Sequence, residues 1–214
     1  MIRVWQIPFS THCERVALAA GLKAIEVGWV DVDAYDRSPV LEVSGQAGVP
    51  VAEIDGEIVV DSLAILRRLE QISPEPPLWP SGEREHAQVE LFLEWFRRAW
   101  MHALGTIYLE LEKAGAIFAE PGNTALDDAK VERAGKRLAA HLDLFESLLA
   151  GSDYLVGDSL TVADIAAFPF LKYATDRTPG DDYPIHEALR RFQPIEGHPR
   201  LAAWLERIDS LPRA

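Results

Sequence analysis

Cysteine is almost absent from this sequence, since Cys13 is the only one in 214 residues. A single cysteine permits no intramolecular disulfide and excludes a zinc site built on several cysteines, and we expect no metal cofactor. Long apolar runs are also missing, because no stretch approaches the roughly 18 residues of a membrane-spanning helix. The first residues, MIRVWQIPFS, carry no apolar segment behind a basic one, so we expect no signal peptide and a cytoplasmic location.

Positive charge is in short supply as well. The chain has 21 basic and 34 acidic residues, a formal charge of −13, and both halves are acidic. Nucleic acid and anionic membrane surfaces would be repelled over most of such a protein, so neither is an expected partner. An anionic ligand would have to be held locally, by helix N-termini and backbone amides. With 48% hydrophobic and 26% charged residues, the chain has the composition of a folded globular protein.

The first part of the chain mixes strand-like and helix-like patterns. In chain order we expect a strand at 2–7, a helix after Ser10, a strand at 24–32, a short irregular helix, a hairpin at 51–60 and a helix from Ser62. Asp55-Gly56 between β-rich runs is the hairpin signal. The β-α-β opening predicts a parallel pair, to which the hairpin adds antiparallel strands.

The composition changes at residues 73–82, where four prolines predict a linker. Beyond it helical periodicity dominates, and we expect helices near 85–118, 124–150, 162–174, 184–192 and 198–210. The chain therefore divides into an α/β domain at 1–78 and an all-α domain at 83–214. In the second domain, Thr161 to Asp164 read as a helix capping box with a folding role.

Four motifs occur in a fixed order along the chain. They are PFSTHCERVALAAGL at 8–22, Val49-Pro50 before a strand, a hairpin ending in Asp61-Ser62, and SLTVADIAAFPFL at 159–171. Together they resemble the soluble glutathione transferase family over essentially the whole chain. The resemblance implies a thioredoxin-like N-terminal domain, an all-α C-terminal domain, glutathione as co-substrate and a homodimer.

The resemblance implies two contact regions for glutathione. Val49-Pro50 would form a cis peptide bond, with the Val49 backbone paired to the cysteinyl part of the ligand. The Ser62 hydroxyl and the first N–H groups of its helix would hold the γ-glutamyl carboxylate, while Asp61 accepts from the ammonium. Asp61 and Ser62 also suit a plain helix cap, and both roles can hold together.

The sequence departs from the family just before Val49. Many members carry Lys or Gln at that position, where the side chain grips the glycyl carboxylate, but this chain has Gly48. Gln46 and Arg37 are the candidates to compensate.

Ser10 occupies the first position of an S-x-x-C motif between the first strand and the first helix. In the family this position holds serine in zeta-like classes and cysteine in omega-like ones, so the resemblance makes Ser10 the group that stabilises the glutathione thiolate. Lowering a thiol pKa from about 8.5 to about 6.5 takes about 2.7 kcal/mol. A hydrogen bond to a charged acceptor supplies about 1.5–3 kcal/mol and a helix N-terminus about 0.3–1, so no general base is needed.

Neighbouring residues offer alternatives to Ser10. Thr11, one position on, is the second catalytic candidate. His12 either orients a substrate or is a solvated loop histidine. Cys13 either packs as a small apolar group or acts as a single reactive thiol.

The second substrate would lie beside the first long helix of the all-α domain. Trp95, Trp100 and His102 from this helix, with Phe9 and His12, are the predicted lining of a pocket for a hydrophobic electrophile. The alternative is that the aromatic residues belong to the core. Trp95 and Trp100 are about 140° apart around a helix, so one of them could face a pocket or a dimer surface.

Three functional hypotheses follow from these residues. The first is a glutathione transferase, acting on an electrophilic carbon or catalysing a zeta-like isomerisation. The second is a non-catalytic transferase-like module used for binding or assembly. The third is a glutathione-dependent reductase that uses Cys13.

Overall fold

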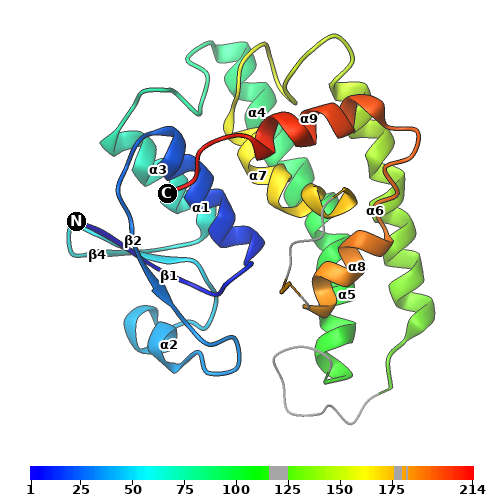
Figure 1. Cartoon of the computed structure of the whole chain (residues 1–214), viewed down its shortest axis with the longest axis horizontal. Coiled ribbons are helices and arrows are strands. Elements are labelled where there is room, and N and C mark those ends of the chain that lie inside the picture. Colours follow the sequence, from blue (N-terminus) through cyan, green and yellow to red (C-terminus); the bar gives the residue numbers. More distant parts are fainter. Residues whose placement is uncertain (116–124, 176–179, 182) are drawn as a thin grey trace. The chain divides into compact units, whose positions relative to one another are not determined.

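The computed structural model of the protein describes residues 1–115, 125–175, 180–181 and 183–214. They form two compact units, one of Met1–Leu78 with Ser210–Ala214 and one of Trp79–Asp209 (Figure 1). The first unit holds a mixed α/β structure and the second is helical. The predicted fold class, an α/β domain followed by an all-α domain, is confirmed.

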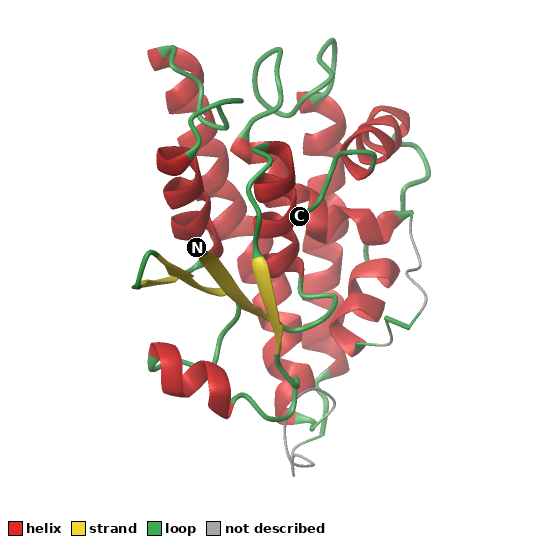
Figure 2. Ribbon diagram, turned by 60° about the vertical axis from the view of Figure 1, so that its left-hand side comes forward, coloured by secondary structure: helices red, strands yellow, loops and turns green. Residues whose placement is uncertain are grey.

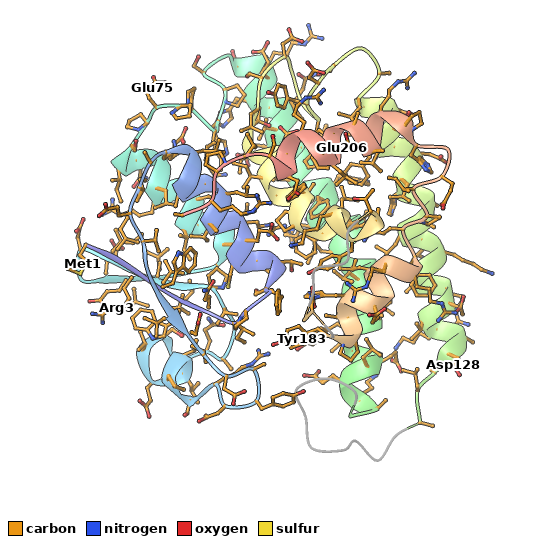
Figure 3. All side chains as sticks on the ribbon, in the orientation of Figure 1. Met1, Arg3, Glu75, Asp128, Tyr183 and Glu206 are labelled. Carbon is orange, nitrogen blue, oxygen red and sulfur yellow. The ribbon has the colours of Figure 1, made fainter. Side chains whose placement is uncertain are left out.

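The first unit is built on one sheet of β1 (Ile2–Gln6), β2 (Gly28–Asp31), β3 (Val51–Ile54) and β4 (Glu57–Val60). The strand order is β2-β1-β3-β4, with β1 and β2 parallel and the other two pairs antiparallel, as the sequence predicts. Met1 and Arg3, labelled in Figure 3, mark the start of β1. The predicted strand at 24–32 is shorter in the structure, because the chain still turns after the first helix at Ala24, whose φ is 51°.

Three helices complete the first unit: α1 (Thr11–Leu22), α2 (Ser38–Ser44) and α3 (Ser62–Ile72). The α1 and α3 helices lie together on one side of the sheet and α2 lies on the other (Figures 1 and 2). Fully buried apolar side chains from the strands and from α1 and α3 form the core of this unit: Val4, Val16, Leu18, Val51, Ile54, Ile65, Leu66 and Leu69. Because α1 and α3 pack against the same side of the sheet, this core determines where their N-terminal ends lie.

The last five residues pack with the first unit, although the predicted all-α domain ran to residue 214. The Ala214 N–H donates to the Ala17 carbonyl at 3.0 Å, and the Trp29 indole N–H donates to the Ala214 carbonyl at 3.1 Å. Gly21 allows this approach, since a Cβ there would lie 2.4 Å from the Pro212 carbonyl oxygen.

The proline-rich segment after α3 is tied to the first unit by Lys23, whose side chain is fully buried. Its ammonium donates to the carbonyls of Ser73 and Pro76 at 2.7 and 2.9 Å and pairs with Glu70 at 2.6 Å. All three ammonium hydrogens are thereby used, which is how a buried charge is tolerated.

The second unit consists of helices α4 (Glu83–Trp95), α5 (Met101–Lys113), α6 (Asp128–Leu148), α7 (Val162–Leu171), α8 (Pro184–Arg191) and α9 (Pro199–Asp209), with a short 3₁₀ turn at Lys172–Ala174. One turn of π-helix, Phe96–Trp100, connects α4 to α5, so the predicted helix at 85–118 is interrupted. The wider turn brings the Phe96 and Trp100 rings into a stack with centroids 5.9 Å apart. The predicted helix limits at 118 and 124 lie outside the described residues.

The α7 helix is buried along its whole length and begins with the predicted capping box of Thr161 and Asp164. One Asp164 oxygen accepts from the Leu155 N–H and the Trp204 indole N–H, both at 2.9 Å, and the other accepts from the Thr161 N–H at 2.9 Å. Burial raises the pKa of Asp164, and these hydrogen bonds oppose that rise. Asp164 thus joins α7, α9 and the preceding loop.

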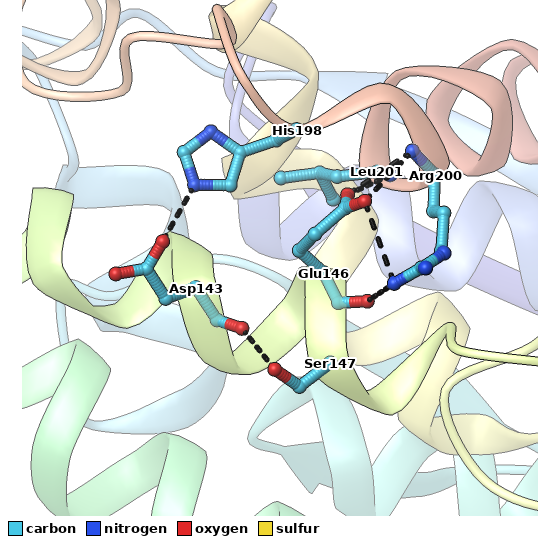
Figure 4. A network of polar contacts seen from close by, with 6 residues as sticks. All are labelled: Asp143, Glu146, Ser147, His198, Arg200 and Leu201. Carbon is cyan, nitrogen blue, oxygen red and sulfur yellow. Dashed lines mark hydrogen bonds and ion pairs between the residues drawn. The ribbon is translucent and has the colours of Figure 1, made fainter.

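A second polar network joins α6 to α9 (Figure 4). The Glu146 carboxylate accepts from the backbone N–H groups of Arg200 and Leu201 at 3.0 and 2.9 Å, so it caps the N-terminus of α9. Asp143, which like Glu146 belongs to α6, has its Oδ1 3.1 Å from Nε2 of His198, the residue just before α9.

Among the described residues no helix has the length and apolarity that crossing a bilayer requires.

Candidate functional site

The turn between β1 and α1 sets the position of Ser10. Pro8 and Phe9 occupy the centre of this turn, and the Ser10 N–H donates to the Ile7 carbonyl at 3.1 Å. Phe9 has φ 64°, in the left-handed region that suits the third residue of a tight turn but is uncommon for a side chain other than glycine. Phe9 is 37% exposed. The chain leaves this turn directly into α1.

Ser10 is the N-cap residue of α1 and is half-buried. Its Oγ accepts a hydrogen bond from the Cys13 N–H at 3.4 Å. A capping hydroxyl uses its oxygen as the acceptor, so it can still donate its own hydrogen, and it does so at the positive end of the helix dipole. Thr11, the second catalytic candidate, is the first residue of the helix and is 8% exposed.

Cys13 is 2% exposed. Burial raises the pKa of its thiol to about 11, and hydrogen bonding with the Ser10 side chain and the Ile7 backbone opposes the rise only in part. Nucleophilic attack needs the thiolate, and at that pKa only about one thiol in ten thousand is ionised at neutral pH. The environment of Cys13 is that of a small buried apolar group.

His12, Arg15 and Ser62 form a cluster where the N-terminal parts of α1 and α3 meet. Arg15 Nη1 donates to Ser62 Oγ at 3.1 Å and lies 3.2 Å from His12 Nδ1. Arg15 and Ser62 are 5% and 2% exposed, and His12 is half-buried. The interpretation of His12 as a solvated loop residue is therefore wrong, because it lies in the first turn of α1 and contacts a buried guanidinium.

The electrostatics of this cluster follow from its burial. Burial and the Arg15 charge lower the pKa of His12 to about 3, so the imidazole is neutral at physiological pH. Burial lowers the pKa of Arg15 to about 10, while the negative charge of Asp61 acts in the opposite direction. The cluster thus holds a positive charge below the surface of an acidic protein. Arg15 is not among the site residues predicted from the sequence; the available signal was an arginine three residues after His12, beside the apolar residues of α1.

Asp61 is the N-cap residue of α3, with φ 76°. Its Oδ1 accepts from the N–H groups of Leu63 and Ala64 at 2.9 and 3.1 Å. The sequence predicts that the first N–H groups of this helix bind the ligand carboxylate, but those of Leu63 and Ala64 are already bonded to Asp61. Within the described part of the chain, the Ser62 N–H and Asp61 Oδ2 make no hydrogen bond, so these two groups remain for a ligand.

The predicted cis peptide bond between Val49 and Pro50 is confirmed. Three residues before Val49, the Gln46 side chain bonds to both backbone groups of Gly48: its Nε2 donates to the Gly48 carbonyl at 2.7 Å and its Oε1 accepts from the Gly48 N–H at 3.0 Å. Arg37 donates through Nε to the Ala34 carbonyl at 3.1 Å and through Nη1 to the Ala47 carbonyl at 3.4 Å. In this structure both residues predicted to compensate for Gly48 are thus engaged with nearby backbone.

Trp95, Trp100 and His102 belong to the second unit. Trp100 is fully buried and packs edge-on against Phe145 at 5.5 Å, which places its ring in the core. Trp95 is half-buried and meets the same Phe145 at 5.7 Å, and His102 is exposed. A role for Trp95 and His102 in lining a pocket with Phe9 and His12 stays a prediction. In the described ranges, no group of three or more His, Cys, Asp and Glu side chains is placed to hold a metal ion.

Comparisons with known proteins match both halves of the chain. Residues 5–77 match the family model described as glutathione S-transferase, N-terminal domain, and residues 128–207 match that of the C-terminal domain.

Among curated relatives, maleylacetoacetate isomerase from Dictyostelium discoideum is 30% identical over 167 residues, which span 77% of this chain and 69% of that protein. FtsZ-localized protein A from Caulobacter vibrioides is 27% identical over 165 residues, spanning 75% and 71%. A solved glutathione S-transferase structure from Methylobacillus flagellatus with gsh bound shares the fold, with a TM-score of 0.76, 21% identity and coverage of 97% and 94%.

Proposed function

Since this chain belongs to the glutathione S-transferase family, we propose that it is a glutathione transferase in which Ser10 stabilises the glutathione thiolate. The observation that carries the role of Ser10 is its place as the N-cap of α1, where the hydroxyl oxygen accepts from Cys13 and the hydroxyl hydrogen can be donated. The reaction is either addition of the thiolate to an electrophilic carbon or a zeta-like isomerisation, the second supported by the maleylacetoacetate isomerase relative.

The chemistry needs a thiolate rather than a strong base. The thiol proton leaves to solvent, and the sulfur anion then accepts from the Ser10 hydroxyl at the positive end of α1. The two contributions together, about 2–4 kcal/mol, are enough to lower a thiol pKa by about two units. With a pKa of about 3, His12 is too weak a base to take the proton at neutral pH.

The glutathione backbone would be held by groups of the first unit. The γ-glutamyl carboxylate accepts from the Ser62 hydroxyl and N–H beside the buried Arg15 charge, and Asp61 Oδ2 accepts from the ammonium. The Val49 backbone pairs with the cysteinyl part. The glycyl carboxylate has the weakest site, because Gln46 and Arg37 bond to backbone groups.

The electrophile is proposed to be a hydrophobic small molecule. The protein is further proposed to act in the cytoplasm and as a homodimer, as its family resemblance implies. Light scattering tests the second point: a mass of about twice 23.8 kDa is expected, and a monomer would contradict it.

The second candidate function is a non-catalytic binding or assembly module. The two hydrogen bonds from the Gln46 side chain to the Gly48 backbone favour this module, because they leave the Gln46 amide unable to bind the glycyl carboxylate of glutathione. The name of one relative, FtsZ-localized protein A, describes a location rather than a reaction. The reductase hypothesis is not retained, because Cys13 is buried with a raised thiol pKa.

Titration calorimetry of the protein with reduced glutathione tests the proposal, followed by turnover of a chlorodinitrobenzene electrophile and of a cis-dienoate for isomerisation. We expect binding at millimolar ligand or below and turnover of at least one of the two substrates. Binding without turnover of either would favour the module. Absence of binding at millimolar glutathione would reject the transferase.

A further inference from the structure

A single nitrogen of Arg15 serves two acceptors on two different helices. Nη1 lies 3.2 Å from His12 Nδ1 and 3.1 Å from Ser62 Oγ. A guanidinium Nη carries two hydrogens and cannot accept. One hydrogen therefore goes to the imidazole and the other to the hydroxyl, so both are used inside this cluster.

This bond determines the tautomer of His12. Because the guanidinium only donates, His12 Nδ1 must present its lone pair, and the ring proton is on Nε2. A doubly protonated ring would set an N–H donor against the Arg15 N–H and break the contact. The lowered pKa of His12 agrees with this assignment.

The same bond determines what Ser62 can do. Its oxygen accepts from Arg15, so its hydroxyl hydrogen needs an acceptor. Among the described residues the only acceptor near it is His12 Nδ1, at 3.5 Å, whose lone pair already receives the closer Arg15 hydrogen. Ser62 is 2% exposed, and a buried donor with so weak a partner is stabilised when a ligand supplies an acceptor.

A purely structural role for the cluster is the alternative. The α1 and α3 helices already share a buried apolar core that includes Leu18 and Leu66, so the bridge is not needed to bring them together. Burial moreover disfavours the Arg15 charge, as its lowered pKa shows. A buried positive charge beside an underused hydroxyl donor suits an anionic ligand better than it suits packing.

We propose that His12 is a positioning residue for glutathione: by accepting from Arg15 it holds the guanidinium against Ser62 Oγ, and this directs the Ser62 hydroxyl hydrogen to the γ-glutamyl carboxylate. The inference rests on the proposed transferase function and adds to it a role for His12 in binding. It predicts that His12 affects the affinity for glutathione and leaves thiolate activation at Ser10 largely unchanged.

The test compares His12→Leu, which removes the acceptor, with His12→Asn, whose side-chain oxygen can replace Nδ1. We expect His12→Leu to raise KM and Kd for glutathione by about tenfold, the range for losing the support of a charge-assisted hydrogen bond, while kcat stays within about threefold. His12→Asn should keep KM within about threefold of the unchanged protein. His86→Leu, an exposed histidine of the second unit, is the matched control and should change neither constant.

Three results would overturn the proposal: KM unchanged in His12→Leu, an equal loss in His12→Asn, or a fall confined to kcat. A second measurement covers the case in which His12→Leu does not fold. KM for glutathione in the unchanged protein should be flat between about pH 5.5 and 8, since His12 stays neutral there; a step near pH 6.5 that is absent from His12→Asn would contradict the assignment. Failure of the unchanged protein to bind glutathione would reject the transferase itself, whereas failure confined to the His12 variants would reject only this role.

Discussion

Arg15 of α1 donates to the hydroxyl of Ser62 on α3 across 3.1 Å, so the two helix N-termini of the first unit share one buried positive charge. Ser10 caps the first of these helices and Asp61 caps the second. Each of the two termini therefore combines a hydroxyl donor with the positive end of a helix dipole, the arrangement that holds an anion in an otherwise acidic protein.

Replacing Ser10 by alanine removes the hydroxyl donor to the thiolate. We expect Ser10→Ala to lower turnover of an electrophile by about tenfold or more, because a hydrogen bond to a charged acceptor contributes about 1.5–3 kcal/mol. The Kd of glutathione should change little, since the γ-glutamyl end is held elsewhere. Thr11→Ala is the comparison: if it abolishes turnover and Ser10→Ala does not, Thr11 is the catalytic hydroxyl.

Cys13→Ser separates a transferase from a thiol reductase. Because the Cys13 thiol is buried and its pKa is about 11, we expect turnover within about threefold of the unchanged protein. Labelling of the native protein with a thiol reagent should likewise be slow until it is unfolded. Rapid native labelling, or loss of glutathione-dependent reduction in Cys13→Ser, would restore the reductase hypothesis.

Gly48→Lys tests the weak site for the glycyl carboxylate. A Cβ at this position would lie 2.7 Å from Gln46 Oε1, the end of an exposed and flexible side chain, so the substitution costs little if Gln46 moves. We expect the new ammonium to lower KM for glutathione by about two- to fivefold, the value of an exposed charge pair. Gly48→Ala displaces Gln46 in the same way without adding a charge. If both variants lower KM equally, the effect comes from Gln46 and not from the ammonium.

Acid should destabilise the folded protein at a pH above the range in which the carboxylates with lowered pKa titrate. Burial lowers the pKa of His12 from 6.5 to about 3 and also lowers the pKa of His186. Below pH 6.5 the unfolded chain therefore binds protons that the folded protein does not, and stability falls as pH falls from 6.5 towards 3.

Urea unfolding at about pH 7.5 and pH 5 measures this decline. The carboxylates with lowered pKa are Asp36, Glu94 and Glu110, and they lose their contribution only as pH falls below their ordinary values of 3.8 and 4.5, so the decline above pH 4.5 belongs to the histidines. His12→Asn should show a smaller decline than the unchanged protein. Equal or greater stability at pH 5 would contradict the assignment.

Local signals in the sequence were sufficient for most of the fold. Asp55-Gly56 marked the β3–β4 hairpin, the prolines at 73–82 marked the end of the first unit, and Thr161 to Asp164 marked the start of α7, because turn, linker and capping chemistry depend on neighbouring residues. The π-helical turn at Phe96–Trp100 left no such signal. It depends on how a row of aromatic rings packs against Phe145, which is not visible in helical periodicity.

The sequence by itself determined the fold class, the family and the position of Ser10 after the first strand, because each depends on motifs that are short and contiguous. Only the tertiary structure decided that Cys13 is buried, that Gln46 folds onto Gly48, and that Arg15 and His12 meet Ser62 from 47 and 50 residues away along the chain. The pKa of a group and its hydrogen-bond partners depend on what surrounds the group in space. For His12, burial and the contact with Arg15 turned an apparent loop histidine into a neutral acceptor in the core of the candidate site.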